Sequence, residues 1–312
     1  MVANEWTEGI FASLWRKANK DKKHFTWLVL DGPVDAIWIE NMNTVMDDNR
    51  ILTLANNDRI PMLRPNVTLH FEVEDLRNAS PATVSRAGII YVSEDDLGWQ
   101  PMATSYLAKR PAEEAKELQL FFDRYVGPML NFLSRECHSK MSCSEMGLVA
   151  SLTTQLSALI AQAHEFNGGA ASAAISSTHL ERMFILALLW SLAGLLETAD
   201  RVKVDLKLRT VTKLLPTNTG EGETVYEYRV HEVSGEWEYW GAKVPEWDPP
   251  TTDIGASFAS ILVPTIDSAR CEYTLELSLG QQRPVLLIGG PGTAKTSTVL
   301  QVLSKLNPAT NA

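Results

Sequence analysis

The chain has 312 residues, of which 45% are hydrophobic and 21% are charged, a composition typical of a folded protein with a sizeable core. Its formal net charge of −10 argues against nucleic-acid binding, which depends on Lys and Arg at phosphate groups. Three scattered cysteines without C-x-x-C spacing argue against a disulfide framework and favour a reducing compartment. The most apolar run, residues 183–196, is shorter than the roughly 18–20 residues that span a bilayer. We therefore expect a buried helix there, and neither nucleic acid nor a membrane as a partner.

The first hundred residues alternate between helical and strand-like patterns. Residues 5–20 have helical periodicity, with an expected apolar face formed by Ile10, Phe11, Leu14, Trp15 and Ala18. The following elements are expected to be a strand over 25–31, a helix over 35–48, a β-hairpin with strands at 51–54 and 59–62, a strand over 67–73, and a turn leading into a strand within 80–92. The hairpin turn contains Asn-Asn-Asp, and these residues tolerate positive φ angles.

Residues 111–200 read as helices, separated by breaks at 127–128, 141–144 and 167–169. The pattern becomes strand-like over 201–250, with turn signals between the runs. A helix over 267–279 ends at a glycine, and residues 284–290 (PVLLIGG) predict a strand that leads into a Gly-rich loop and a final helix over 296–306. The last part therefore predicts the order strand, loop, helix.

That Gly-rich loop matches the phosphate-binding loop of nucleotide-binding proteins. Its residues are Gly289, Gly290, Pro291, Gly292, Thr293, Ala294, Lys295 and Thr296. Small residues let backbone N–H groups surround phosphate oxygens, and the helix N-terminus adds partial positive charge. The lysine would reach the β- and γ-phosphates of ATP or ADP, and the final threonine hydroxyl would bind Mg²⁺. Ala294 stands where a second glycine is usual, which is unfavourable only if a positive φ is required there.

The position of this loop indicates how the chain is organised. In such domains the loop follows the first strand, and a later strand ends in the Asp that handles Mg²⁺. Only 16 residues follow the loop, so the domain it begins is not expected to fit in what remains. Residues 25–31 end at Asp31 and could be that later strand of a preceding domain, although an ordinary buried strand ending in Asp is an equally good interpretation. The consistent arrangement is two tandem modules, the first without its beginning and the second without its end.

The sequence resembles dynein heavy chains, in the ring of AAA+ modules, over essentially its whole length. The run DGPVDAIWIENMNTVMDDN is the most specific, and it is supported by EWTEGIFASLWR, FEVEDLRNASPATVSRAGIIYV, ILVPTIDSARCEYTLELSL and LLIGGPGTAKT. In sequence these segments are similar to those of axonemal heavy chains, and most similar to those of outer-arm heavy chains. The resemblance implies an α/β fold of partial AAA+ P-loop modules in tandem. Its parts would be the large subdomain of the second module over 1–110, the helical lid over 111–200, and the start of the third module over 201–312.

The resemblance also implies roles for single residues. Asp31 matches the Walker B aspartate of the second module, but Gly32 occupies the place of the glutamate that acts as general base, so we expect nucleotide binding without ordinary hydrolysis there. Arg86 matches the arginine finger that acts on a neighbouring module. Glu74 falls near the sensor position, where an acid would be a poor partner for a γ-phosphate, and the hairpin over 50–62 matches an insert that faces the linker.

As a whole, the resemblance implies a segment of the ATP-driven, minus-end-directed microtubule motor ring of dynein, in the cytoskeleton of the ciliary or flagellar axoneme. Its partners would be the flanking AAA+ modules and linker, the intermediate and light chains and, indirectly, microtubules. The alternative is a truncated, non-catalytic fragment or scaffold, because no hydrolytic site is complete within the chain. A free-standing P-loop kinase or GTPase is disfavoured by the position of the loop.

Overall fold

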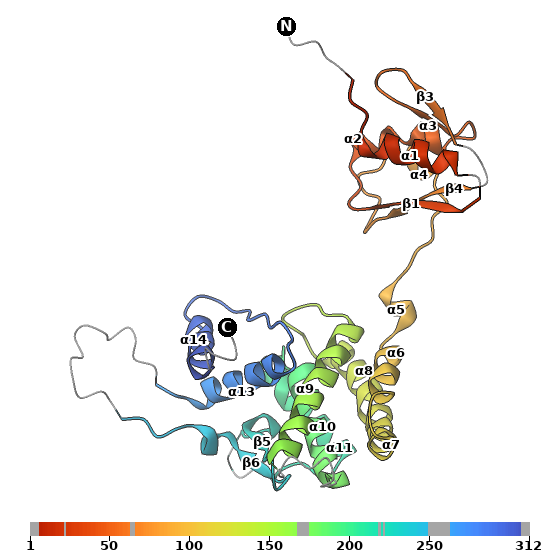
Figure 1. Cartoon of the computed structure of the whole chain (residues 1–312). Helices are drawn as coiled ribbons and strands as arrows, with labels where there is room; N and C mark the ends of the chain where they lie inside the picture. Colours follow the sequence, from red (N-terminus) through yellow and green to blue (C-terminus); the bar gives the residue numbers. More distant parts are fainter. Residues whose placement is uncertain are drawn as a thin grey trace, which may run out of the picture. The chain divides into compact units, whose positions relative to one another are not determined.

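The computed structural model describes residues 6–21, 23–62, 66–166, 175–217, 220, 222–248 and 263–306. The chain divides into two compact units, residues 1–92 and residues 93–312 (Figure 1). Each unit has its own hydrophobic core, and we describe them separately.

The first unit is built on a parallel strand pair. Strand β1 (Thr26–Asp31) pairs with β4 (Val67–Glu72) over six residues, so that both strands end at the same edge. Strands β2 (Ile51–Thr53) and β3 (Arg59–Pro61) form an antiparallel hairpin, whose turn contains Asn57 at a φ of 66°. The predicted strands over 25–31 and 67–73 and the predicted hairpin are confirmed.

The helices of the first unit differ in detail from the prediction. Helix α1 (Ile10–Lys20) buries Trp15 and Ala18 in the core, but Ile10 is 82% and Leu14 46% exposed, so the predicted apolar face is only partly correct. The predicted helix over 35–48 is two short helices, α2 (Ala36–Glu40) and α3 (Asn43–Met46).

The strand predicted within residues 80–92 is wrong. Ser80 caps a four-residue helix, α4 (Pro81–Val84), and residues 85–92 form no strand. A strand requires a neighbour to pair its backbone N–H and C=O groups, and no described residue pairs with this run. The side chains of residues 89–92 are between 57% and 85% exposed, so local β-propensity alone does not form a strand here.

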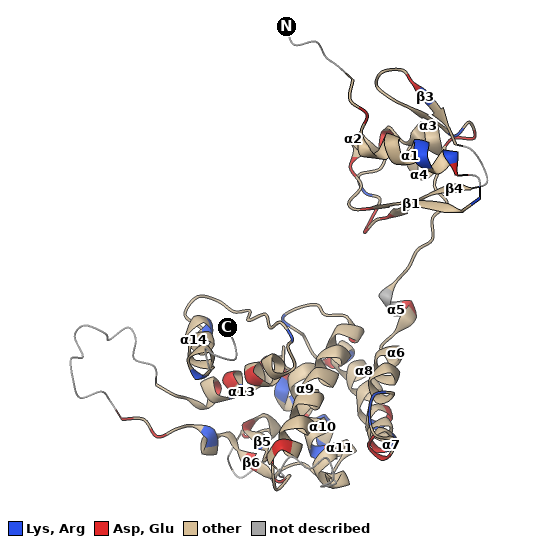
Figure 2. Cartoon of the chain, viewed as in Figure 1, with Lys and Arg blue, Asp and Glu red and all other residues tan. Residues whose placement is uncertain are grey.

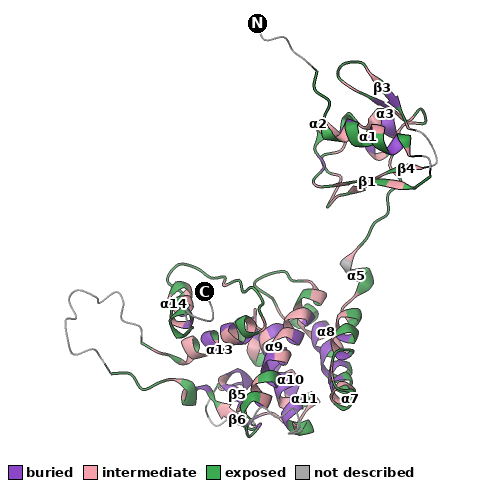
Figure 3. Cartoon of the chain, viewed as in Figure 1, coloured by how far each residue is buried: buried purple, intermediate pink, exposed green. Residues whose placement is uncertain are grey.

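The second unit is mainly helical, as predicted for residues 111–200. Its first helices are α5 (Glu94–Leu97), α6 (Gln100–Leu107), α7 (Ala112–Phe121), the π-helix η1 (Phe122–Val126), α8 (Gly127–Glu136), α9 (Glu145–Phe166), α10 (Ser177–Ser191) and α11 (Thr198–Val211). Helices α9 and α10 contribute more buried side chains to this core than any other described element (Figure 3). Helix α9 is long and apolar enough to cross a membrane by composition, and half of that window is buried in this core. The predicted buried helix over 183–196 is confirmed for residues 183–191, which belong to α10, whereas residues 192–196 follow the end of that helix.

The strand-like pattern predicted from residue 201 onward is wrong for α11. Apolar residues alternate at positions 202, 204, 206 and 208, which is the spacing of a strand. In the helix, Val204 and Leu208 lie one turn apart and are fully buried, whereas Val202 and Leu206 are 40% and 60% exposed. Half of the alternating set therefore faces the core with a spacing of four residues, and burial of that half stabilises a helix.

The rest of the unit contains short strands and two further helices. They are the 3₁₀-helix η2 (Val225–Glu227), strands β5 (Tyr228–Val230) and β6 (Trp237–Tyr239), the 3₁₀-helix η3 (Trp240–Lys243), α13 (Ile266–Gly280) and α14 (Lys295–Lys305). The two last helices were predicted within one or two residues. The strand predicted over 284–290 is wrong: this segment has no strand partner among the described residues, and Leu286 is 78% exposed.

The turn between β5 and β6 packs on the first turn of α10. Gly235 has a φ of +68°, and a Cβ added there would lie 2.4 Å from Cγ of His179, so only glycine fits. His179 is 6% exposed, and its Nε2 has no hydrogen-bond partner among the described residues. Burial lowers the pKa of His179 below its ordinary 6.5; Arg182 and His231 lower it further and Glu236 opposes them.

Candidate nucleotide site

The predicted phosphate loop joins the largely exposed segment 283–288 to the first turn of α14. Gly292 and Ala294 both have left-handed backbone conformations, with φ angles of 77° and 57°. Ala294 is the N-cap residue of α14 and makes no side-chain cap. The positive φ therefore does occur at the position where alanine replaces the usual glycine, and it carries the steric cost of a Cβ there.

Lys295 folds back over the loop that precedes it. Its Nζ donates to the backbone oxygens of Gly289 (2.8 Å) and Gly290 (2.6 Å) and to Oγ1 of Thr293 (3.1 Å). Thr296 follows as the second residue of α14, and its side chain is exposed. The structure therefore brings together the predicted lysine and the glycine backbone, and leaves the predicted Mg²⁺-binding hydroxyl accessible.

Helix α14 is attached to α13 at the end remote from the loop. Nζ of Lys305 lies 2.6 Å from Oε2 of Glu272 and 3.2 Å from Oε1 of Glu276, two acids one turn apart on α13. Figure 2 shows acidic positions, drawn in red, along α13. Near the loop, Oγ1 of Thr298 donates to the carbonyl of Ala294 (3.0 Å). Val302, three residues before Lys305, is 1% exposed. The loop is therefore held by a helix that is itself packed and ion-paired.

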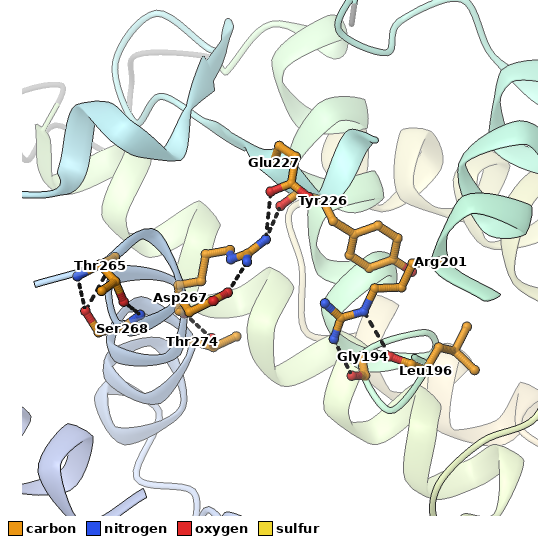
Figure 4. Close-up of polar contacts among 10 residues, drawn as sticks. Gly194, Leu196, Arg201, Tyr226, Glu227, Thr265, Asp267, Ser268 and Thr274 are labelled. Carbon is orange, nitrogen blue, oxygen red and sulfur yellow. Dashed lines mark hydrogen bonds and ion pairs between the residues drawn. The ribbon is translucent and has the colours of Figure 1, made fainter. Parts of the chain in front are cut away.

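Helix α13 is in turn fixed to the helical body of the second unit. Nη1 of Arg270 donates to Oε2 of Glu227 (3.0 Å) and to the carbonyl of Tyr226 (3.3 Å), and its other Nη pairs with Asp267. Figure 4 shows Tyr226, Glu227 and Asp267 around these contacts. On the other side of Tyr226, the guanidinium of Arg201 lies 5.2 Å from the ring centroid. Charged contacts therefore connect α11, η2 and α13, and through α13 the loop helix.

Asp31, the predicted Walker B residue, lies at the end of β1 in the first unit. It is exposed, and its register partner on β4 is Glu72. The N–H of Gly32 donates to the carbonyl of Glu72 (3.2 Å), and a Cβ added to Gly32 would meet nothing within 4 Å. The surroundings of position 32 would therefore accommodate a side chain, so sterics do not explain why the acid of a general base is absent there. Glu72 was not predicted, although its place at the end of an apolar strand, as for Asp31, was a usable signal.

Arg86, the predicted arginine finger, follows α4 in the first unit. Its Nε pairs with Asp47, and one Nη donates to the carbonyl of Ala82 (2.7 Å). Its side chain is 32% exposed, so the guanidinium is held by its own unit and still reaches the surface. Asp47 was not predicted, because it lies 39 positions away and nothing in the local sequence pairs the two residues. Glu74 is exposed beyond the end of β4.

Comparison with known proteins places these observations in one family. Residues 118–242 match a family model described as the dynein heavy chain AAA lid domain, and residues 251–312 match a model described as the P-loop containing dynein motor region. The chain is 44% identical, over all of its length, to the dynein gamma chain of the flagellar outer arm from Chlamydomonas reinhardtii. It is 40% identical over 98% of its length to human dynein axonemal heavy chain 8, and likewise to human dynein axonemal heavy chain 2.

The chain spans about 7% of the length of each of these relatives. The two family models cover most of the helical second unit and the phosphate loop. The alignments to the relatives also cover the first unit, with Asp31 and Arg86. The chain belongs to the dynein heavy chain family, as a segment of its AAA+ motor region.

Proposed function

We propose that residues 289–296 bind the phosphates of ATP or ADP together with Mg²⁺, as the phosphate loop of an AAA+ module in a dynein motor ring. The observation that best supports this proposal is the position of Lys295, whose ammonium contacts the backbone of the loop. This loop has left-handed residues at Gly292 and Ala294 and leads into the N-terminus of an 11-residue helix. A bound polyphosphate would receive the lysine ammonium and backbone N–H groups, and the helix N-terminus would add partial positive charge. Thr296 would bind Mg²⁺, which neutralises phosphate charge.

In the first unit, we propose that Asp31 contributes to a nucleotide site without ordinary hydrolysis. Gly32 has no group that could polarise an attacking water, and this supports binding without turnover. Arg86 would act on nucleotide held by the neighbouring module, since its guanidinium reaches the surface. We propose the module boundaries given by the sequence: large subdomain over 1–110, lid over 111–200, and the start of the next module over 201–312.

At the level of the whole protein, we propose a role in the minus-end-directed microtubule motor of cilia and flagella. Family membership and the names of the flagellar and axonemal relatives support this. The segment would then couple neighbouring AAA+ modules and face the linker, within a complex that also contains intermediate and light chains. The contacts of Lys305 and Arg270 support coupling, because they join the loop helix through α13 to Glu227, which lies within the residues matched by the AAA lid family model.

A titration of this chain with a fluorescent ATP analogue, with Mg²⁺ and with EDTA, tests the proposal. We expect saturable, Mg²⁺-dependent binding that is lost in Lys295→Ala and kept in Lys17→Ala, a matched change of an exposed lysine in the first unit. Equal binding by both variants, or none by the unsubstituted chain, would favour the non-catalytic scaffold. Turnover by this chain that requires Lys295 would instead exclude the non-catalytic alternative.

A further inference from the structure

The turn between β5 and β6, residues 231–236, is closed by a histidine that can do so only in its neutral form. Nδ1 of His231 accepts hydrogen bonds from the backbone N–H groups of Val233 (3.2 Å) and Ser234 (3.3 Å). A neutral imidazole has one acceptor nitrogen, whereas a protonated imidazole has two donors and no acceptor. Protonation of His231 therefore removes both hydrogen bonds and turns an N–H group toward two other N–H groups.

A second histidine, on α10, lies against the same turn. A Cβ added to Gly235 would lie 2.4 Å from Cγ of His179, so the imidazole and the turn backbone are in close contact. His179 is 6% exposed, and burial lowers its pKa. A charged imidazole here would lose its hydration without gaining a partner at Nε2, which has none among the described residues. The closed turn therefore also requires a neutral His179.

Arg182 anchors the closed turn and already uses the nearest acid. Its Nη1 donates to the carbonyl of Gly235 (2.7 Å) and lies 2.6 Å from Oε1 of Glu236. Burial, Arg182 and His231 all lower the pKa of His179, and Glu236 opposes them. The side chain of Glu236 is 68% exposed, so water weakens the compensation that it can offer.

The other charged groups near the turn do not reverse this balance. Glu232 is paired with Arg229 at 2.7 Å and with Lys243 at 3.3 Å. Lys213, which follows α11, lines the pocket beside the ion pair of Arg182 and adds positive charge. A proton taken up by either imidazole of the turn therefore enters surroundings that do not stabilise it.

We infer that residues 231–236 form a proton-sensitive clasp, which holds β5 and β6 on α10 while His179 and His231 are both neutral and opens when either takes up a proton. Because folding lowers the pKa of His179 from its ordinary 6.5, the clasp is fully closed above about pH 6.5 and is lost as the pH falls below it. Strand β6 leads into η3, where Trp240 packs edge-on against Tyr273 of α13, with ring centroids 5.3 Å apart. Opening of the clasp therefore loosens a connection between α10 and α13, and it does so independently of the proposed nucleotide site.

Amide hydrogen exchange at pH 7.5 and 5.5, corrected for the intrinsic pH dependence of exchange, tests the clasp. The N–H of Gly235 donates to the carbonyl of His231 at 3.0 Å, so its protection reports the closed turn. An ordinary imidazole is protonated about ten to one at pH 5.5, and we expect the protection of Gly235 to fall by up to about ten-fold for each histidine involved. Low concentrations of urea should leave this exchange unchanged, because a local opening exposes little surface.

Two substitutions remove the titrating groups and keep the contacts. His231→Asn supplies a side-chain oxygen that can accept from the backbone N–H two residues on and does not titrate. His179→Gln keeps a Cβ and a Cγ against the turn and stays neutral. We expect the loss of protection at pH 5.5 to shrink in each variant and to vanish in the double variant. His24→Gln, a matched change of a histidine that is 78% exposed in the first unit, should keep the full loss.

The clasp is overturned if the protection of Gly235 falls equally in the unsubstituted chain and the double variant, or does not fall in the unsubstituted chain. A urea response equal to that of global unfolding would also overturn it. If a variant already opens the turn at pH 7.5, the imidazole NMR signals of the unsubstituted chain decide. The signals of His179 and His231 should then change together with the Gly235 amide as the pH falls, and titration without any change at that amide contradicts the clasp.

Discussion

Replacing Ala294 with glycine should stabilise the phosphate loop. In the interior of an ordinary helix, the same replacement of alanine by glycine destabilises the helix. Ala294 has φ and ψ angles of 57° and 15°. An L-residue in this region is disfavoured by about 1–2 kcal/mol, and glycine loses roughly 0.5–1 kcal/mol more conformational freedom on folding. The net gain is about 0.5–1 kcal/mol, which corresponds to an about two- to five-fold shift toward the ordered loop.

Amide hydrogen exchange measures this shift locally. The Thr298 N–H donates to the carbonyl of Ala294 at 2.9 Å, so its protection reports whether the loop and the first turn of α14 are formed together. We expect protection of Thr298 to rise about two- to five-fold in Ala294→Gly. Ala161→Gly, at an exposed position within α9, is the matched control and should lower protection of that helix.

The opposite substitution sharpens the test. Ala294→Val places a β-branched residue in the left-handed region and should lower the protection of Thr298. Reduced protection of Thr298 in Ala294→Gly, parallel to the loss in Ala161→Gly, would show that the positive φ at 294 carries no strain, and the reasoning would fail.

Three further changes probe the second unit. Arg270→Met removes the guanidinium that joins α13 to Tyr226 and Glu227, and should lower the free energy of unfolding by about 1–3 kcal/mol in urea melts, against no change in Arg135→Met, an exposed arginine. Leu208→Ala should cost about 2–5 kcal/mol because the side chain is fully buried, whereas Leu206→Ala should change thermal stability little. Because the pKa of His179 is lowered in the folded state, protonation favours unfolding: stability should fall as the pH drops below about 6.5, and less so in His179→Gln, as urea melts at pH 7.5 and 5.5 would show. An equal loss in both proteins would rule out His179 as the cause.

Features specified by neighbouring residues were predictable from the sequence. The phosphate loop, the helix that follows it and the turn of the hairpin depend on short-range signals such as glycine, Lys-Thr and Asn-Asn-Asp. The buried part of α10 was predictable because its apolar run is shorter than a bilayer span and so was expected in a core. The capping box at the start of α13, between Thr265 and Ser268, is likewise local (Figure 4).

Features that depend on distant partners were not predictable in the same way. Residues 80–92 and 284–290 have the composition of strands, but pairing is a property of the neighbour and these runs have none among the described residues. The alternation in α11 was ambiguous until the core selected Val204 and Leu208. Partners of predicted site residues, such as Asp47 beside Arg86, are brought close only by the folded backbone. The positive φ of Ala294 could not be inferred from the sequence either. Alanine in place of the usual glycine changes the energetic cost of that backbone conformation, but it does not change the chemical groups of the loop.

The measurement that most directly tests the central claim is hydrogen–deuterium exchange of this chain with and without Mg²⁺ and ADP. If residues 289–296 hold the phosphates, nucleotide should slow exchange in the loop and the first turn of α14, and Lys295→Ala should abolish that change. Exchange that is unaffected in this segment under saturating nucleotide, or slowed only at sites elsewhere in the chain, would contradict the assignment of the loop as the nucleotide site.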